Sequence, residues 1–187
     1  MKNDDQVDEK QENQRIRLSK TLLKNALMEL LKEKRIEKIS IYEICNKAQI
    51  NRTTFYKYYG NQYDLLSDIE NDCICALELH FSLNRKQDII TLKNVLKYLE
   101  SEREKFMILL NSTDGNEFVF KLFNLPLIVN LFNLRFSADY SKNLKEYFHL
   151  FVCNGGYAII RKWLSDDDRI SLDDMAKLLD SVFNCRF

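Results

Sequence analysis

Side chains that suit contact with a nucleic acid gather in one short stretch of this 187-residue chain. The donors are Arg52, Thr53, Thr54, Tyr56, Lys57 and Tyr58. Arginine and lysine match guanine edges, and a threonine methyl can meet a thymine methyl, each good base contact giving about 1–3 kcal/mol of discrimination. A helix face that only meets solvent has no packing reason to display so many such groups. The pattern therefore predicts a nucleic-acid contact surface.

Capping signals around this stretch indicate the helices that must hold it. Ser40 with Glu43 three residues later is typical of a capping box, so a helix is expected to begin near Ile41. Asn51 is a second favourable N-cap, which predicts another helix over residues 52–59 after a turn at residues 48–50. Apolar or small residues fall where two short crossed helices must pack, at Ile44, Cys45, Ala48, Ile50, Phe55 and Tyr58.

The resulting unit is a helix, a turn and a second helix, the arrangement that places its second helix in a DNA major groove. Phe55 and Tyr59 are expected to be buried packing residues. Ser40 and Tyr42, at the start of the first motif helix, are expected to contact the DNA backbone, because helix N-termini bind phosphate well. Together these residues indicate a sequence-specific DNA-binding protein.

The run Ile44 to Tyr59, followed by Asp64-Leu65-Leu66, resembles the DNA-binding segment of the TetR/AcrR family of bacterial transcriptional regulators. Thr54-Phe55-Tyr56, with the aromatic pair after Lys57, is the most specific part of the match. The resemblance is close over roughly residues 15–70 and looser over residues 155–183.

This resemblance implies an all-helical homodimer, usually a repressor that a small-molecule effector releases from a palindromic operator. It also assigns Tyr56 and Tyr58 to phosphate contacts. Two positions depart from the family pattern. Gln49 stands in the turn where the family commonly has glycine, for which positive φ costs little. Gln62 stands where the family often has a phosphate-binding lysine, which is expected to flatten the salt dependence of binding.

The charge distribution supports a basic DNA-binding part independently of the motif. The chain carries 28 basic and 28 acidic residues, so its net charge is zero. Residues 15–59, however, hold eleven basic and four acidic residues, a net charge of +7. Residues 1–14 and 60–187 are both net acidic. A basic head therefore joins an acidic body.

Composition predicts an all-α protein large enough to bury a core. Four glycines and one proline force few turns, and 45% of the residues are hydrophobic. No apolar run approaches the roughly 18 residues of a membrane helix, and the polar N-terminus lacks the apolar region of a signal peptide. A cytoplasmic location without a membrane partner is expected. Residues 1–14 are predicted to form a flexible polar tail.

Residues 15–61 are expected to form the helix-turn-helix domain and residues 62–187 a helical regulatory and dimerisation domain. A long helix is predicted from Gln62 towards Phe81, and further helices near 88–101, 103–111, 115–137, 141–165 and 172–184. Pro126 lies inside one of these, which predicts either a kink that opens a ligand cavity or a junction between two helices.

The last two predicted helices are candidates for a dimer interface, because paired glycines in an apolar stretch suggest close helix approach. The candidate residues are Gly155, Gly156, Ile159, Trp163, Leu178 and Phe183. The alternative is that Trp163 and the apolar stripe of the last helix only complete the core of one subunit. Aromatic residues of the body that are candidates to line an effector pocket are Phe106, Phe120, Phe123, Phe151 and Tyr157.

Catalytic and metal sites are not expected. The chain has no phosphate-binding glycine loop, no nucleophile motif and no metal-ligand spacing, and no cofactor is predicted. The five cysteines are interpreted as structural thiols rather than a redox sensor, and His80 and His149 as isolated residues. A competing hypothesis is an interaction protein that keeps this fold but binds DNA weakly and acts through a protein partner. Gln49 and Gln62 favour that hypothesis, whereas the basic head favours DNA binding.

Overall fold

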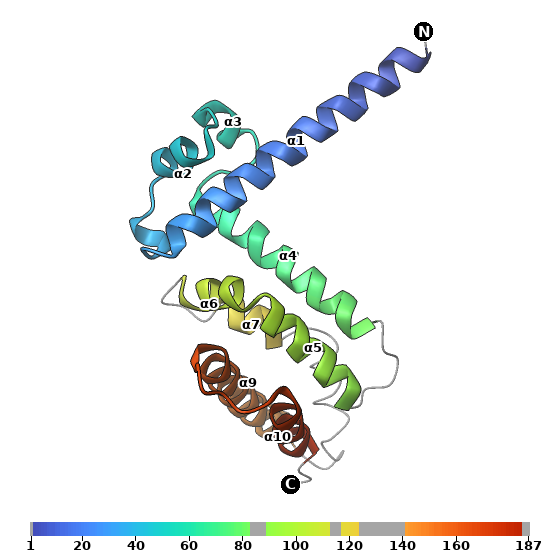
Figure 1. Ribbon diagram of the computed structural model, residues 1–187, viewed down its shortest axis with the longest axis vertical. Coiled ribbons are helices and arrows are strands. Elements are labelled where there is room, and N and C mark those ends of the chain that lie inside the picture. Colours follow the sequence, from blue (N-terminus) through green and yellow to red (C-terminus); the bar gives the residue numbers. More distant parts are fainter. Residues whose placement is uncertain (1, 83–88, 113–116, 124–140, 185–187) are drawn as a thin grey trace. The chain divides into compact units, whose positions relative to one another are not determined.

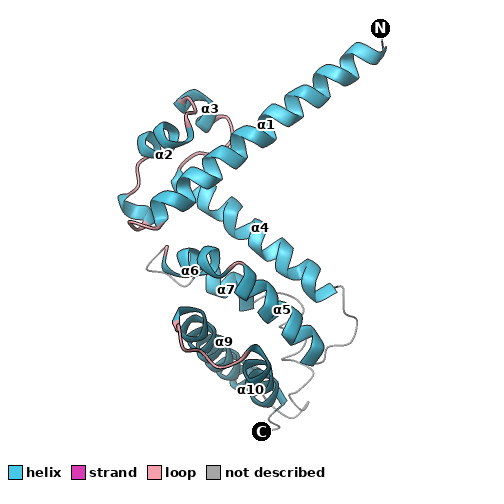
Figure 2. Cartoon of the chain, in the orientation of Figure 1, coloured by secondary structure: helices cyan, strands magenta, loops and turns pink. Residues whose placement is uncertain are grey.

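The computed structural model describes residues 2–82, 89–112, 117–123 and 141–184, and every regular element in these ranges is a helix (Figures 1 and 2). The protein is all-α, as its composition predicted. The first elements are α1 (Lys2–Leu31), the short 3-10 helix η1 (Ile36–Lys38), α2 (Ile41–Ala48) and α3 (Arg52–Tyr56). They are followed by α4 (Gln62–Ser82), α5 (Ile89–Ser101), α6 (Arg103–Asn111), α7 (Glu117–Phe123), α9 (Lys142–Ser165) and α10 (Leu172–Asn184).

The chain divides into two compact units, Met1–Asn71 and Asp72–Phe187. The division falls within α4, so this single helix contributes its first half to one unit and its second half to the other. The boundary expected between residues 61 and 62 instead coincides with the start of α4.

The core of the first unit forms where α1, α2, α3 and the beginning of α4 contribute apolar side chains. Leu23 and Leu27 of α1 are fully buried, and Ile44 of α2 and Phe55 of α3 are as well. These positions recur at helical spacing, as the sequence predicted, and α1 packs against α2 while α2 packs against α3. The helix-turn-helix is therefore seated on α1.

Helix α1 extends further towards the N-terminus than expected. The sequence predicted a flexible tail over residues 1–14, whereas the structure continues the helix to Lys2 (Figure 1). Residues 2–14 contain no glycine and no proline, so nothing in this stretch prevents helical backbone geometry. A polar composition predicts solvent exposure, and it does not by itself exclude a helix.

The second unit is held by helix packing and by ion pairs between elements. Helix α10 packs on α5, and α9 packs on α6 and α7. Arg169 forms an ion pair with Glu100 at 2.7 Å, and Lys93 forms one with Asp173 at 2.9 Å. The helix predictions for 88–101, 103–111, 141–165 and 172–184 are confirmed to within a residue. Pro126 lies outside the described residues.

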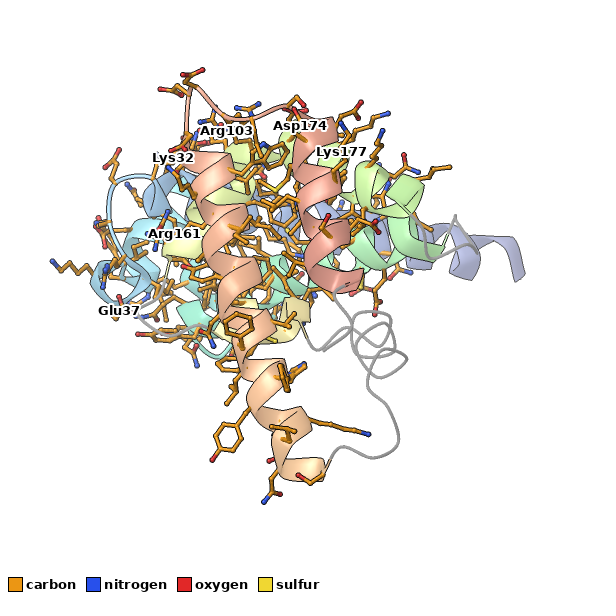
Figure 3. All side chains as sticks on the ribbon, turned by 90° about the horizontal axis from the view of Figure 1, so that it is seen from below. Lys32, Glu37, Arg103, Arg161, Asp174 and Lys177 are labelled. Atoms are coloured by element: carbon orange, nitrogen blue, oxygen red, sulfur yellow. The ribbon has the colours of Figure 1, made fainter. Side chains whose placement is uncertain are left out.

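Arg103, which is labelled in Figure 3, caps the carboxyl end of α9. Its guanidinium donates to the carbonyl oxygens of Leu164, Ser165 and Asp166. The last carbonyls of a helix have no partner within the helix, so these bonds satisfy groups that would otherwise need water. Among the described residues, no helix is both long and apolar enough to span a bilayer.

Candidate nucleic-acid interface

The first motif helix, α2, begins with the capping box that the sequence predicted. The backbone N–H of Ser40 donates to a carboxylate oxygen of Glu43 at 2.8 Å, and the backbone N–H of Glu43 donates to the Ser40 hydroxyl at 3.3 Å. Lys34 adds an ion pair to the same carboxylate. The bond from Lys34, followed by those from Ser40, lowers the pKa of Glu43 from its usual 4.5 to about 2. The start of α2 is therefore fixed by an ionised carboxylate.

Gln49 ends α2 in the left-handed region, with φ 55° and ψ 39°. The next residue, Ile50, donates its backbone N–H to the carbonyl of Cys45 at 2.9 Å. This is the bond pattern of a Schellman-type helix end, where glycine is the usual left-handed residue. The turn thus has the left-handed backbone that glycine adopts easily, and glutamine adopts it at a conformational cost that glycine would avoid.

Asn51 caps α3, as predicted, by accepting a hydrogen bond from the backbone N–H of Thr53 at 3.2 Å. The helix ends at Tyr56 rather than at Tyr59. Beyond it, the backbone N–H groups of Tyr58 and Tyr59 both donate to the carbonyl of Phe55, at 2.9 and 3.0 Å. A tight turn therefore replaces the predicted last helical turn and directs the chain towards α4.

The two faces of this segment differ as the sequence predicted. Phe55 is fully buried and Tyr59 is 5% exposed, with their ring centroids 5.7 Å apart. On the other face Arg52, Thr53 and Lys57 are exposed. Tyr56 is half exposed, and Thr54 and Tyr58 are partly buried. The buried aromatic residues thus hold a surface of basic and hydroxyl side chains towards solvent.

Arg52 and Tyr56 lie one helical turn apart on α3. Interaction with the Tyr56 side chain raises the pKa of Arg52 above its already high usual value, so the guanidinium stays charged. The pair presents a cation and an aromatic hydroxyl together on the exposed face of α3.

The flanking candidates lie at the starts of two other helices of this unit. Ser40 is exposed, although its side chain is engaged in the capping box, and Tyr42 is 66% exposed in the first turn of α2. Gln62 is partly buried at the first position of α4, whose start is capped by Asn61 through bonds from Tyr63 at 2.8 Å and Asp64 at 3.0 Å. Ser40, Tyr42 and Gln62 are therefore placed at helix N-termini, where phosphate contacts are favourable.

Part of the positive charge of the head is paired internally. Lys20 and Lys24 of α1 lie 3.9 and 3.1 Å from Asp68 of α4, and Lys32 pairs with Glu29. Asp68 was not singled out from the sequence. The buried tyrosine at position 59 was the available signal, because a buried hydroxyl requires a partner.

A contact between His149 and Cys153 corrects the expectation that His149 is isolated. The Cys153 sulfur lies 3.6 Å from Nε2 of His149, one turn earlier on α9. The spacing of four residues on a helix was the signal that could have found it. Burial raises the pKa of the thiols of Cys45, Cys73 and Cys153, which suits their interpretation as structural groups. Cys185 lies outside the described residues.

Comparison with known proteins decides the family. The TetR model described as "Transcriptional regulator C-terminal region" matches residues 90–185, which is more than half of the chain. The chain belongs to the TetR family of transcriptional regulators. The resemblance found in the helix-turn-helix sequence is thereby confirmed by the C-terminal part of the chain. The members of this family are regulators rather than enzymes.

Similar proteins include an uncharacterized HTH-type transcriptional regulator, YxbF, from Bacillus subtilis, 25% identical over 178 residues. That match covers 88% of this chain, and the chain spans 45% of the length of that relative.

Among solved structures, a TetR transcriptional regulator from Streptococcus agalactiae has a TM-score of 0.73 at 21% identity, with coverage of 92% of this chain and 97% of the other. The fatty acid degradation regulator FadR from Bacillus halodurans has a TM-score of 0.59 at 15% identity, covering 88% and 94%. These structures show that this TetR-family chain shares their fold.

The candidate dimer-interface residues of this TetR-family chain differ in how far their side chains are buried. Trp163 is 2% exposed, and its indole N–H donates to the carbonyl of Ile170 at 3.0 Å, so it belongs to the core of its own subunit. This placement favours the stated alternative, in which Trp163 completes the core of its own chain, because apolar position alone does not distinguish a core residue from an interface residue. Leu178 is 41% exposed, and apart from its neighbours along the helix no atom of the described residues lies within 4 Å of where a Gly155 Cβ would be.

Gly156 and Ile159 are partly buried on α9, and the side chain of Phe183 lies outside the described residues. Gly155 was expected to allow close helix approach, but within the described part of its subunit it faces open space.

The candidate pocket residues occupy different environments. Phe106 is 1% exposed and packs against Tyr98 and Phe118, with ring centroids 5.8 and 6.3 Å away. Phe120 and Phe151 are 46% and 67% exposed, and Tyr157 packs against the cluster of Val119 and Cys153. The side chain of Phe123 lies outside the described residues.

Proposed function

We propose that the protein is a homodimeric transcriptional repressor that binds a palindromic operator and is released by a small-molecule effector. The observation that carries the DNA-binding part is the two-faced α3 segment. Phe55 and Tyr59 are buried, while Arg52, Thr53 and Lys57 are exposed beside them. A rigid helix that presents charged and hydroxyl groups from a packed base is what major-groove reading requires.

In this proposal the side chains of α3 divide the work of recognition. Arg52, Thr53, Thr54 and Lys57 contact base edges, and Tyr56 and Tyr58 contact phosphates. Ser40, Tyr42 and Gln62 add contacts to the DNA backbone from the starts of α2 and α4. The protein then acts in the cytoplasm, where its DNA is.

Support for a homodimer comes from apolar surface in the second unit. Tyr147 and Phe151 on α9 are 72% and 67% exposed, and Leu178 on α10 is 41% exposed. These side chains lie on α9 and α10, the two helices that were predicted to form the dimer interface. Burying such side chains against a second copy removes apolar surface from water.

Activation is a second candidate for the direction of control. One protein of similar fold, with a TM-score of 0.52 at 20% identity, is the dihydroxyacetone kinase operon activator DhaS, matched over 88% of this chain. Measuring transcripts of the neighbouring genes after deletion of this gene separates the two directions. Higher transcript levels support repression, whereas lower levels overturn it in favour of activation.

The test of DNA binding is fluorescence anisotropy with the DNA immediately upstream of the gene and a scrambled duplex of the same composition, at two salt concentrations. We expect affinity for the upstream duplex to exceed that for the scrambled duplex by at least about a thousandfold and to fall as salt rises. Equally weak binding to both duplexes would remove the support for an operator there. It would favour an interaction protein that acts through a protein partner.

A further inference from the structure

Asp68 of α4 is the centre of a polar cluster that joins three elements of the first unit. The hydroxyl of Tyr59 donates to Asp68 Oδ2 at 2.7 Å. The Nζ atoms of Lys24 and Lys20, both on α1, lie 3.1 and 3.9 Å from the same oxygen. One carboxylate therefore connects α1, the end of the recognition segment and α4.

The bond to Asp68 satisfies the hydroxyl group of Tyr59, a buried tyrosine. The residue is 5% exposed, and a buried tyrosine hydroxyl needs a hydrogen-bond partner. Its ring packs against Phe55, with centroids 5.7 Å apart. The bond to Asp68 therefore fixes the orientation of the Tyr59 ring, which packs against Phe55 on the buried face of α3.

The same cluster extends to Tyr58, whose hydroxyl is a proposed phosphate contact. The Nζ atom of Lys20 lies 5.9 Å from the centroid of the Tyr58 ring and 5.5 Å from that of Tyr59. At this range a cation over an aromatic face is attracted to it. Lys20 thus interacts both with the Asp68 carboxylate and with the rings of the two tyrosines that follow α3.

The carboxylate of Asp68 is ionised in this setting. Burial raises its pKa, but the hydrogen bonds from Tyr59 and Lys24 and the charges of Lys24 and Lys20 together lower it, and the net shift is downward. Asp68 is only partly buried, so an ionised carboxylate is compatible with its place.

The backbone after α3 is held by a tight turn, and the backbone N–H of Gly60 donates to Asp64 of α4 at 2.9 Å. Regular helix ends at Tyr56, and the amides of Tyr58 and Tyr59 both rely on the carbonyl of Phe55. The side-chain interactions of Tyr59 add to these backbone bonds in setting the direction of residues 57–59, which carry two proposed DNA contacts.

We propose that Asp68 is a positioning residue that fixes the end of the recognition segment between α1 and α4, and thereby sets the orientation in which Lys57 and Tyr58 meet DNA. The effect on DNA rests on the function proposed above, whereas the local ordering does not. In this proposal Asp68 does not contact DNA itself. It acts through its interactions with Tyr59 and Lys20.

Amide hydrogen exchange followed by NMR in the full chain tests the local ordering without DNA. The variants are Asp68→Asn and Tyr59→Phe, which keep side-chain shape, with Glu78→Gln as a control that removes one exposed carboxylate from the same helix. In each of the first two variants we expect exchange at the Tyr58 and Tyr59 amides to rise at least about tenfold, with less than about a twofold change at Leu27 of α1. The double variant should exceed the larger single effect by less than about twofold, because both changes break one contact.

Unchanged exchange at Tyr58 and Tyr59 in both single variants would overturn the proposal. So would an equal rise at Leu27, because a purely structural role lowers the free energy of global opening and speeds every protected amide.

The second measurement is the ratio of affinities for the upstream and scrambled duplexes in the same variants, below their melting temperatures. We expect Asp68→Asn and Tyr59→Phe to lower this ratio about tenfold and Glu78→Gln to leave it unchanged. Failure of the unsubstituted protein to distinguish the duplexes counts against the proposed function, and the exchange experiment still decides the role of Asp68. If the protein distinguishes the duplexes and both variants keep its ratio, the role of Asp68 in DNA reading is refuted.

Discussion

The guanidinium of Arg52 is exposed in the first turn of α3 and is charged. Bidentate contact of such a group with a guanine edge is worth about 1–3 kcal/mol. We therefore expect Arg52→Ala to weaken operator binding about 5- to 150-fold in an anisotropy titration. Its control is Arg15→Ala, which removes one exposed positive charge from α1 and should cost less than about threefold. Equal losses in the two variants would show that Arg52 contributes only to the general field.

Glu43 supplies a pH-dependent contribution to stability. Its pKa is about 2 in the folded protein, against a usual 4.5, so the folded state releases this proton more readily than the unfolded chain. The stabilisation is therefore complete above about pH 5 and is lost as pH falls towards 2. In denaturant titrations, the free energy of unfolding should fall more between pH 5 and pH 3 in the unsubstituted protein than in Glu43→Gln. Parallel pH profiles would refute this role.

At the scale of single residues, local chemistry was predictable from sequence and distant contacts were not. Ser40, Glu43 and Asn51 cap the helices they were predicted to cap, because a cap depends only on side chains within three residues. Phe55 is buried as expected. Asp68 was missed because its partners on α1 are far away in sequence, and only the fold brings them to its carboxylate.

The turn between α2 and α3 determines how these two helices cross, and Gln49 provides its left-handed residue. In the left-handed region a non-glycine residue costs about 1–2 kcal/mol of stability relative to glycine. Glycine recovers only part of this difference, because it also gives the unfolded chain more conformational freedom. We expect Gln49→Gly to raise the free energy of unfolding by about 1 kcal/mol, measured by chemical denaturation. Gln49→Ala is the matched control and should change stability little by this mechanism, because alanine carries the same Cβ. Destabilisation by the glycine would contradict the strain argument.

At the scale of elements, existence and type were predicted better than ends. Glycine- and proline-poor sequence with helical spacing identified α2, α5, α6, α9 and α10 closely. Two ends differed for physical reasons. Helix α3 stops at Tyr56 because the chain must turn towards α4, and α1 begins at Lys2 because polar composition does not exclude a helix. Helix ends depend on what the chain packs against next, which periodicity does not encode.

For the whole molecule, the central expectation is a homodimer formed through the second unit. Leu178 is exposed on α10, so replacing it should leave the subunit folded. We expect Leu178→Asp to shift the protein from dimer to monomer in sedimentation experiments, because a buried unpaired carboxylate opposes association. Lys97→Asp, an exposed change on α5, should leave the dimer intact. A dimer unchanged by Leu178→Asp would place the interface elsewhere.

The family was predictable from the sequence of the head, while the interface and pocket of the body were not. The motif from Ile44 to Tyr59 carries its own spacing, so these residues alone are enough to indicate the family. In the body, Trp163 and Leu178 look alike in sequence because both continue an apolar stripe. Only the fold distinguishes them, since Trp163 is covered by its own subunit and Leu178 is not.

Selection of bound duplexes from a random-sequence DNA pool tests the central claim most directly, because it assumes no operator. We predict enrichment of an inverted repeat whose half-sites are separated by about one helical turn of DNA or a multiple of it. Arg52→Ala should lose the preference at one position of each half-site. A pool that shows no sequence enrichment with the unsubstituted protein would contradict the account of α3 as a reader of DNA sequence.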